Sequence, residues 1–549
     1  MLHNWYFKDN NPIFRFKDLI FSIQLFTDTN RYDLDPSSCN ILKNNENEFE
    51  VSCNQLQWAG GQENALGFVN VKVMFIDKRY QVNIYAKKDE IIKRVKLKLM
   101  EEKLGTVIAK RRYMDEISVE GEIYRYPNGW DSLFTPLVCI KNANDVRYYR
   151  SLDTTVRPKS FTLYKVNETA TVELVYEEDA RFKLNEITVP PFEIGNVSSY
   201  EEIYENQRLY VEKAYNLKKW NDRNDVPSWA KDISLIVSLH GMHWSGYIFN
   251  TYKDMEEKLT WFSKHINPKE VLVYIPGFDG RYYYKYANYT PDARMGGEEG
   301  LKHLIDMAHK LGYHVMPMFM VNGANPKNEG FEIWGTPSIY HSSNGYVKGV
   351  GSCDWDTSRA YDLACGIGLN PGAPLWQDHF VNEAIKQIAK YNFDAIFLDL
   401  AAIYENDPRY STHEGVINII KRLHEKFPHL LISTEGWYDA LSMVFPLSQC
   451  AGQANKGGEM IYHDTPYAKF FDEYNRCFGH LCLGDVAKGR NGVFEWGINL
   501  AERTMPVRKG IIPTLTIVDD TIKIAPNEVL KVIEDAKKYK KQFIERKDK

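Results

Sequence analysis

The stretch "FDAIFLDLAAIYEND", from Phe393 to Asp407, decides how the second half of the chain is interpreted. It begins with a short, almost continuous apolar run, which is typical of a buried strand in a parallel sheet. The run ends on Asp399. A carboxylate at the end of a buried strand costs free energy unless it is paired, hydrated or used. The role of Asp399 therefore depends on which other side chains the fold brings to the same place.

A rhythm of strand, loop and helix surrounds this stretch from about Asp232 onward. The helix candidate before "HVMPMFMVNG" carries Leu301, Leu304 and Ala308 on one face. Successive units with apolar strands predict a parallel sheet covered by helices on both faces. We expect a (β/α)8 TIM-type barrel over residues 231–525; a doubly wound sheet is the alternative, but no GxGxxG follows its first strand. The strand candidates are "ISLIVSLHG", "EVLVYIPGF", "HVMPMFMVNG", "FDAIFLDL" and "LLISTEGW".

The first part of the chain has a different pattern. Short alternating segments such as "LIFSIQLF", "VNVKVMFI", "YQVNIYA" and "ATVELVY" follow one another without a long amphipathic helix. This pattern predicts a multidomain protein that begins with an antiparallel β-sandwich over residues 1–195. Residues 196–230 are predicted to form a helical linker. A lysine-rich amphipathic helix is predicted at 526–549, docked on the barrel.

Composition excludes several classes of function. The net charge of the 549 residues is -5 and the basic residues are scattered, which argues against a nucleic-acid surface. No window approaches the ~20 apolar residues of a membrane span. Eight cysteines without CxxC pairs predict neither a disulfide framework nor a zinc site and favour a reducing compartment. The amino terminus does not resemble a signal peptide, so we expect a cytoplasmic location, although removal of a leader would leave a similar sequence.

The loops that follow the strands hold the candidate site, because a barrel builds its active site at the carboxyl ends of its strands. Aromatic residues make up 13% of the chain, and their rings serve both core packing and stacking on sugars. The candidates after strands one to five are His240, His243, Trp244, Asp279, Arg281, Asn322, Asp399, Tyr404, Glu435 and Trp437. Trp355 and Asp356, in the long segment before the fourth strand, and His463 and Asp464, in "YHDTP", complete the set.

Asp399 and Glu435 form the most informative pair. Neighbouring parallel strands lie ~4.8 Å apart, so carboxyl groups at equivalent heights would be separated by about 5–6 Å. A retaining glycosidase needs ~5–5.5 Å between its nucleophile and its acid/base, whereas an inverting enzyme needs space for a water molecule. Trp437 beside Glu435 would favour a protonated acid, which leaves Asp399 as the ionised nucleophile.

The two motifs "FDAIFLDL" and "LLISTEGW" resemble those of the retaining barrel glycoside hydrolases, a superfamily that includes α-amylase-like enzymes, α-galactosidases and endo-α-N-acetylgalactosaminidases. In several of these families an Asp after strand four is the nucleophile and a Glu after strand five is the acid/base. The resemblance implies a hydrolase for oligosaccharides or glycans, with a leaning towards α-glycosides. Phe397 stands where the α-amylase pattern has Arg, which argues against that branch.

Other functions remain open at this stage. A non-catalytic carbohydrate-binding barrel would need neither carboxylate at that separation. A metal-dependent hydrolase would use His240 and His243, but their spacing of three does not make the two rings converge. A lyase, aldolase or isomerase would want a lysine at a strand end, and none stands out among strands one to five. We therefore predict a glycoside hydrolase with a carbohydrate substrate and without a cofactor or metal; the oligomeric state is not predicted.

Overall fold

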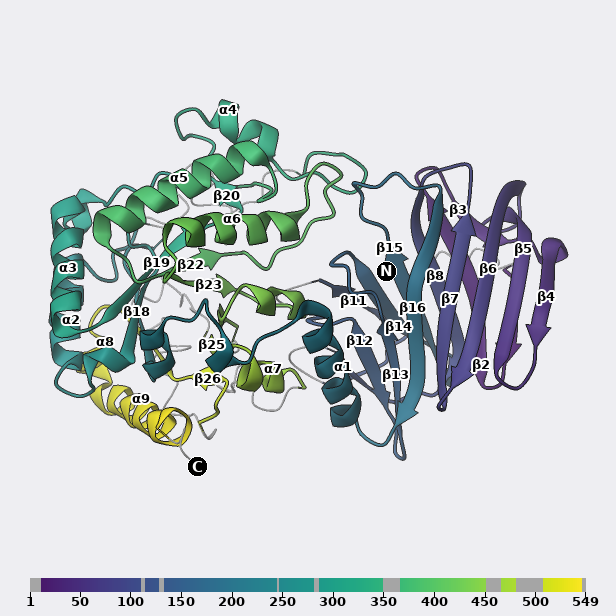
Figure 1. Cartoon of the computed structure of the whole chain (residues 1–549), viewed down its shortest axis with the longest axis horizontal. Helices are drawn as coiled ribbons and strands as arrows, with labels where there is room; N and C mark the ends of the chain where they lie inside the picture. Colours follow the sequence, from purple (N-terminus) through teal and green to yellow (C-terminus); the bar gives the residue numbers. More distant parts are fainter. Residues whose placement is uncertain are drawn as a thin grey trace. The chain divides into compact units, whose positions relative to one another are not determined.

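The computed structural model describes residues 11–109, 114–127, 133–243, 246–280, 286–348, 366–450, 466–479 and 507–545. The chain divides into two compact units, Met1–Tyr215 and Asn216–Lys549, drawn from purple to yellow along the sequence in Figure 1. Helix α1 (Tyr200–Tyr215), which opens with Glu201 and Glu202 in its first turn, belongs to the first unit. None of the described helices is both long and apolar enough to cross a membrane.

The first unit is built from antiparallel strands, as predicted. Its described strands form one hydrogen-bonded sheet with the order β10-β9-β12-β13-β16-β7-β6-β5-β3-β2-β8-β15-β14-β11, to which β1 and β4 add at β2 and β5. The strands are β1 (Phe14–Phe16), β2 (Leu19–Thr27), β3 (Arg31–Leu34), β4 (Cys39–Asn44), β5 (Glu48–Trp58), β6 (Asn64–Ile76), β7 (Arg79–Lys87), β8 (Ile92–Glu102), β9 (Thr106–Ile108), β10 (Met114–Glu116), β11 (Glu122–Tyr126), β12 (Leu137–Lys141), β13 (Val146–Ser151), β14 (Lys159–Val166), β15 (Thr169–Glu177) and β16 (Glu186–Val197).

This long sheet curls back on itself. Strands β13 and β8 are far apart in the hydrogen-bonding order, yet Arg147 on β13 forms a 3.2 Å ion pair with Glu102 on β8. The hydroxyl of Tyr149 donates to the same carboxylate at 2.7 Å. The predicted antiparallel strands are therefore confirmed, but they form one curled sheet around the core instead of a β-sandwich. Sequence periodicity predicts strands without indicating their partners.

A disulfide bond joins two neighbouring strands of this sheet. Cys39 on β4 lies opposite Cys53 on β5, and their sulfur atoms are bonded. The sequence analysis predicted no disulfide framework, and this cross-strand bond corrects that view, because pairing across a sheet leaves no short spacing to recognise. The cytoplasmic location stays a prediction.

The second unit alternates strands and helices. Its parallel strands are β17 (Leu235–Leu239), β18 (Val271–Ile275), β19 (His314–Met320), β22 (Ala395–Asp399), β23 (Leu431–Glu435), β24 (Leu447–Gln449), β25 (Arg476–Phe478), β26 (Ile511–Ile512) and β27 (Thr514–Ile517); β20 (Gly323–Ala324) and β21 (Ile367–Gly368) form a small separate ribbon. Helices lie around these strands (Figure 1): α2 (Tyr252–Phe262), α3 (Gly297–Leu311), α4 (Phe331–Trp334), α5 (Pro374–Tyr391), α6 (Thr412–Lys426), α7 (Ala468–Glu473), α8 (Thr521–Ile524) and α9 (Pro526–Tyr539).

The parallel sheet closes into a barrel. Its order runs β26-β25-β24-β23-β22-β19-β18-β17-β27. The two outermost strands are halves of one segment, Ile511–Ile517, divided at Pro513, which has no N–H to donate. Strand β26 pairs with β25, and strand β27 pairs with β17. Because β26 and β27 share one position in the barrel, the nine strands fill eight positions. The barrel, rather than a doubly wound sheet, is thereby established.

Aromatic side chains fill the barrel and define its inward face. Tyr274 of β18, Phe397 of β22 and Phe478 of β25 have ring centroids 4.8–6.2 Å apart, although their strands are not all neighbours. The hydroxyl of Tyr274 lies 3.2 Å from the sulfur of Met318 on β19. Because side chains alternate along a strand, an inward Phe397 makes Asp399, two residues later, inward as well.

Candidate active site

Asp399 and Glu435 are placed at equal heights by the strand register. Each is the last residue of its strand, β22 and β23, and the pairs Phe397↔Ser433 and Leu398↔Thr434 immediately precede them. Residues in register on neighbouring parallel strands point to the same side. Both carboxylates therefore project from the carboxyl end of the barrel towards its axis.

The backbone of Leu400, the residue that follows Asp399, is held by two hydrogen bonds. The N–H of Leu400 donates to Glu435 Oε2 at 3.1 Å, and the Asn322 side-chain amide donates to the Leu400 carbonyl at 2.9 Å. Leu400 has a φ of 58°, a left-handed conformation that L-residues with large side chains rarely adopt. We refer to this arrangement of Asn322, Leu400 and Glu435 as the Leu400 clamp. It fixes the direction in which the chain leaves Asp399 and ties Asp399 to Glu435.

Further polar side chains at the strand ends are almost completely buried. Asp399 is 3% exposed, Asp279 after β18 is 1% exposed and His240 after β17 is 0% exposed. Burial, followed by the nearby His243, holds the pKa of His240 well below its ordinary value. His240 is therefore neutral near pH 7, with one ring nitrogen as a donor and the other as an acceptor.

The two histidines after β17 pack around one aromatic ring. The centroid of Phe249 lies 4.9 Å from His240 and 5.8 Å from His243, and the two imidazoles are 6.3 Å apart. Within the described ranges, no group of three histidine, cysteine or acidic side chains is arranged to hold a metal ion.

The structure places the Trp437 side chain in the core, away from solvent. Its side chain is 0% exposed, its indole N–H donates to Ser442 Oγ at 3.0 Å, and its ring packs on Phe470 and Phe471 of α7. Trp437 supports the end of β23 by packing. Tyr404 follows β22 and is half-buried. The candidates Trp244, Arg281, Trp355, Asp356, His463 and Asp464 lie outside the described residues.

The sequence analysis missed two features of this site. Gln449 ends β24 in register with Glu435 and is 2% exposed, so it belongs to the same layer as the two carboxylates. Gln449 would have been a candidate residue if "FPLSQ" had been interpreted as the sixth barrel strand. The Leu400 clamp had no signal in the sequence, because it depends on one backbone conformation and on a neighbour from another strand.

Comparisons with known proteins agree with this architecture. No protein-family model matches the chain, and no curated protein matches it in sequence. The solved structure of an α-N-acetylgalactosaminidase from Bifidobacterium bifidum is 11% identical, with a TM-score of 0.66 over 96% of this chain and 93% of that one. The galactosidase domain of an α-galactosidase–sucrose kinase is 13% identical, with a TM-score of 0.54 over 95% and 72%.

An α-galactosidase from Geobacillus stearothermophilus is 10% identical, with a TM-score of 0.51 over 95% of this chain and 75% of that one. These matches span both units of the chain. At such identities the likeness concerns the fold, which is the fold of glycoside hydrolases that the sequence motifs resembled.

Proposed function

We propose that the protein is a glycoside hydrolase that cleaves α-linked sugars in an oligosaccharide or glycan with retention of configuration. The observation that carries this proposal is the pair of inward carboxylates, Asp399 and Glu435, at equal heights on neighbouring barrel strands. The preference for α-linkages is supported by the similar structures, whose names describe α-galactosidases and an α-N-acetylgalactosaminidase.

Asp399 acts as the nucleophile in this mechanism. Its carboxylate attacks the anomeric carbon and forms a covalent glycosyl-enzyme, while Glu435 gives a proton to the departing glycosidic oxygen. Glu435 then takes a proton from water, which attacks the same carbon and releases the sugar. Strand spacing of ~4.8 Å supports this double displacement, because it leaves no space for a water molecule between the two carboxyl groups.

The Leu400 clamp contributes orientation. The Leu400 N–H donates to Glu435 Oε2 and so helps to fix the orientation of this carboxyl group beside Asp399. Asn322 fixes the carbonyl of Leu400, in the next peptide, and with it the path of the backbone directly after Asp399. His240, Asp279 and Gln449 supply further buried donors and acceptors for sugar hydroxyls.

The test is hydrolysis of a panel of aryl α- and β-glycosides, including the α-galactoside and the α-N-acetylgalactosaminide, by the wild type and Asp399→Ala. We expect turnover of at least one α-glycoside that falls by about 10³-fold or more in the variant. Proton NMR of the first sugar released should show the α-anomer, which identifies retention. Release of the β-anomer would contradict the double displacement, and unchanged turnover in Asp399→Ala would exclude the proposed nucleophile. Sugar binding without turnover by the folded wild type would indicate a binding barrel.

A further inference from the structure

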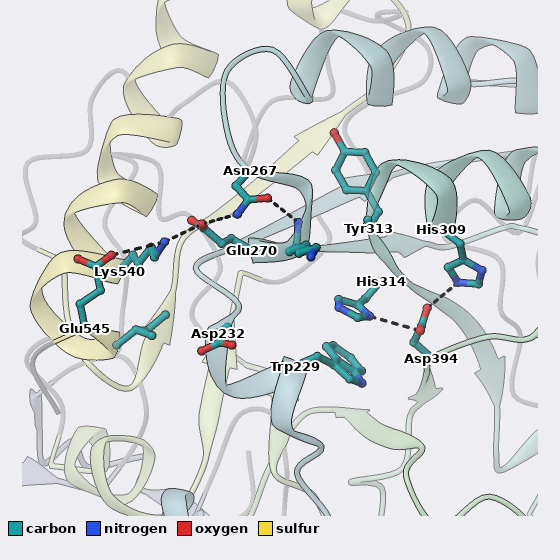
Figure 2. Close-up of a pocket in the computed structure, with 13 residues that line it drawn as sticks. Trp229, Asp232, Asn267, Glu270, His309, Tyr313, His314, Asp394, Lys540 and Glu545 are labelled. Carbon is teal, nitrogen blue, oxygen red and sulfur yellow. Dashed lines mark hydrogen bonds and ion pairs between the residues drawn. The ribbon is translucent and has the colours of Figure 1, made fainter.

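A second concave site lies at the opposite end of the barrel, where the strands begin (Figure 2). The pocket has a volume of about 730 Å³. Its walls come from the short helix η3 (Ser228–Asp232), the starts of β18 and β19, the residue before β22, and the turn η10 (Lys540–Ile544) that follows α9. In barrels this end usually serves stability, so an open pocket there calls for its own explanation.

Two stacked rings form one wall of the pocket. The half-buried indole of Trp229 lies on the imidazole of His314, with centroids 4.0 Å apart and planes within 14°. Asp394 fixes this imidazole, because its Oδ1 lies 3.3 Å from His314 Nδ1 while its Oδ2 lies 2.9 Å from His309 Nε2. The aromatic wall is therefore held in place before any ligand arrives, which lowers the entropic cost of binding.

The opposite wall offers a buried carboxylate. Glu270 is 8% exposed, and its Oε1 accepts bonds from Asn267 Nδ2 at 3.0 Å and from Lys540 Nζ at 2.7 Å (Figure 2). Both bonds fall on one oxygen, and within the described ranges none reaches Oε2. The exposed side chains of Asp232 and Lys269 lie at the rim of the same pocket. The pocket thus offers two acceptors, one donor and an aromatic wall to a ligand.

We propose that this pocket binds a sugar residue without cleaving it. Acidic side chains outnumber lysines among its lining residues, which excludes an anionic ligand. The acids inside the pocket already have partners, Glu270 with Lys540 and Asp394 with two histidines, so a cation finds no concentrated negative field. A neutral, polyhydroxylated ring matches what remains, because its hydroxyls both donate and accept and its C–H face packs on aromatic rings. This second site stands independently of hydrolysis at the other end.

The experiment follows Trp229 itself. The protein is prepared with 5-fluorotryptophan in an Asp399→Ala background, and Trp229→Phe assigns the fluorine resonance of Trp229. Galactose, N-acetylgalactosamine, glucose and xylose are then titrated up to about 100 mM, a range that reveals millimolar affinity. We expect the Trp229 resonance to shift and saturate with at least one sugar.

A pair of double variants tests the chemistry of the site. Asp232→Ala with Lys269→Ala removes the acceptor and the donor at the rim, and should raise the Kd measured at Trp229 at least tenfold. Asp222→Ala with Lys264→Ala makes the same changes at exposed residues outside the pocket and should leave that Kd unchanged. An unmoved Trp229 resonance with every sugar, or equal Kd values in the two double variants, would overturn the proposal. Both readouts are separate from glycoside turnover.

Discussion

Two aspartates stand at the two ends of strand β22, and the fold gives them opposite surroundings. Asp394 precedes the strand and lies between His309 and His314, and it also accepts the N–H of Val315 at 2.9 Å. Burial opposes ionisation, but these bonds prevail and lower the pKa of Asp394 to about 2. Asp399 ends the strand at the level of a second carboxylate, Glu435.

The difference separates a carboxylate used for stability from one used for chemistry. The hydrogen bonds that Asp394 forms favour the folded state because they favour its ionised form. Asp399 instead lies beside a second carboxyl group, Glu435, an arrangement that persists where function requires it. Substitutions at and around these two aspartates test the difference.

The largest effect is expected for Asp399→Asn. Glycosidase turnover should fall by about 10³-fold or more, because the amide cannot form the glycosyl-enzyme. The free energy of unfolding should stay the same or rise, since a buried carboxyl group is replaced by a neutral amide. Measured kcat/KM and urea unfolding test both parts, and Asp394→Asn serves as the matched control on the same strand. A variant that loses stability together with activity would show that Asp399 has a structural role like that of Asp394.

Glu435→Gln is expected to produce the next largest effect. Turnover of an aryl glycoside with a poor leaving group should fall by about 10²- to 10³-fold, because the proton donor is lost. A dinitrophenyl glycoside needs little protonation, so its glycosylation rate should fall far less. Steady-state and burst kinetics with both substrates provide the measurement. An equal loss of turnover with the two leaving groups would show that Glu435 accepts the Leu400 N–H but does not act as the proton donor.

Asp394→Asn should affect stability instead of turnover. Because the pKa of Asp394 is lowered in the folded state, its contribution is present above the ordinary aspartate pKa near 4 and disappears as the pH falls towards about 2. We expect the variant to lose about 2 kcal/mol of unfolding free energy at pH 7 and progressively less below pH 4. Urea unfolding from pH 7 to pH 3 measures this difference. A loss independent of pH would mean that the carboxylate charge is not responsible.

The smallest effect is expected for Asn322→Ala, which removes one side of the Leu400 clamp. We expect kcat to fall about tenfold, equivalent to ~1.4 kcal/mol, with KM changed less, because the loss affects orientation of Asp399. Gln387→Ala is a matched control at a buried amide of helix α5. A rise in KM with an unchanged kcat would assign Asn322 to substrate binding alone.

Sequence patterns predicted the barrel strands well where each strand was a continuous apolar run followed by a recognisable loop. They also indicated that Asp399 and Glu435 end successive strands, which is the core of the candidate site. The later strands are harder to recognise in the sequence, and Pro513 divides the closing one into two short halves. Long-range geometry explains the other omissions: neither the curled sheet nor the packing of Trp437 against α7 depends on residues close in sequence.

The closing segment Ile511–Ile517 also governs how this barrel can be made. Its strand β27 pairs with β17, with Ile236 opposite Thr514. The first barrel strand therefore cannot complete its pairing until one of the last described segments has been synthesised. Until then β17 and β25 have exposed edges, which are templates for wrong pairing between chains. Contacts so distant in sequence also form slowly. During translation, the unfinished barrel is therefore the stage at which this chain most needs a chaperone.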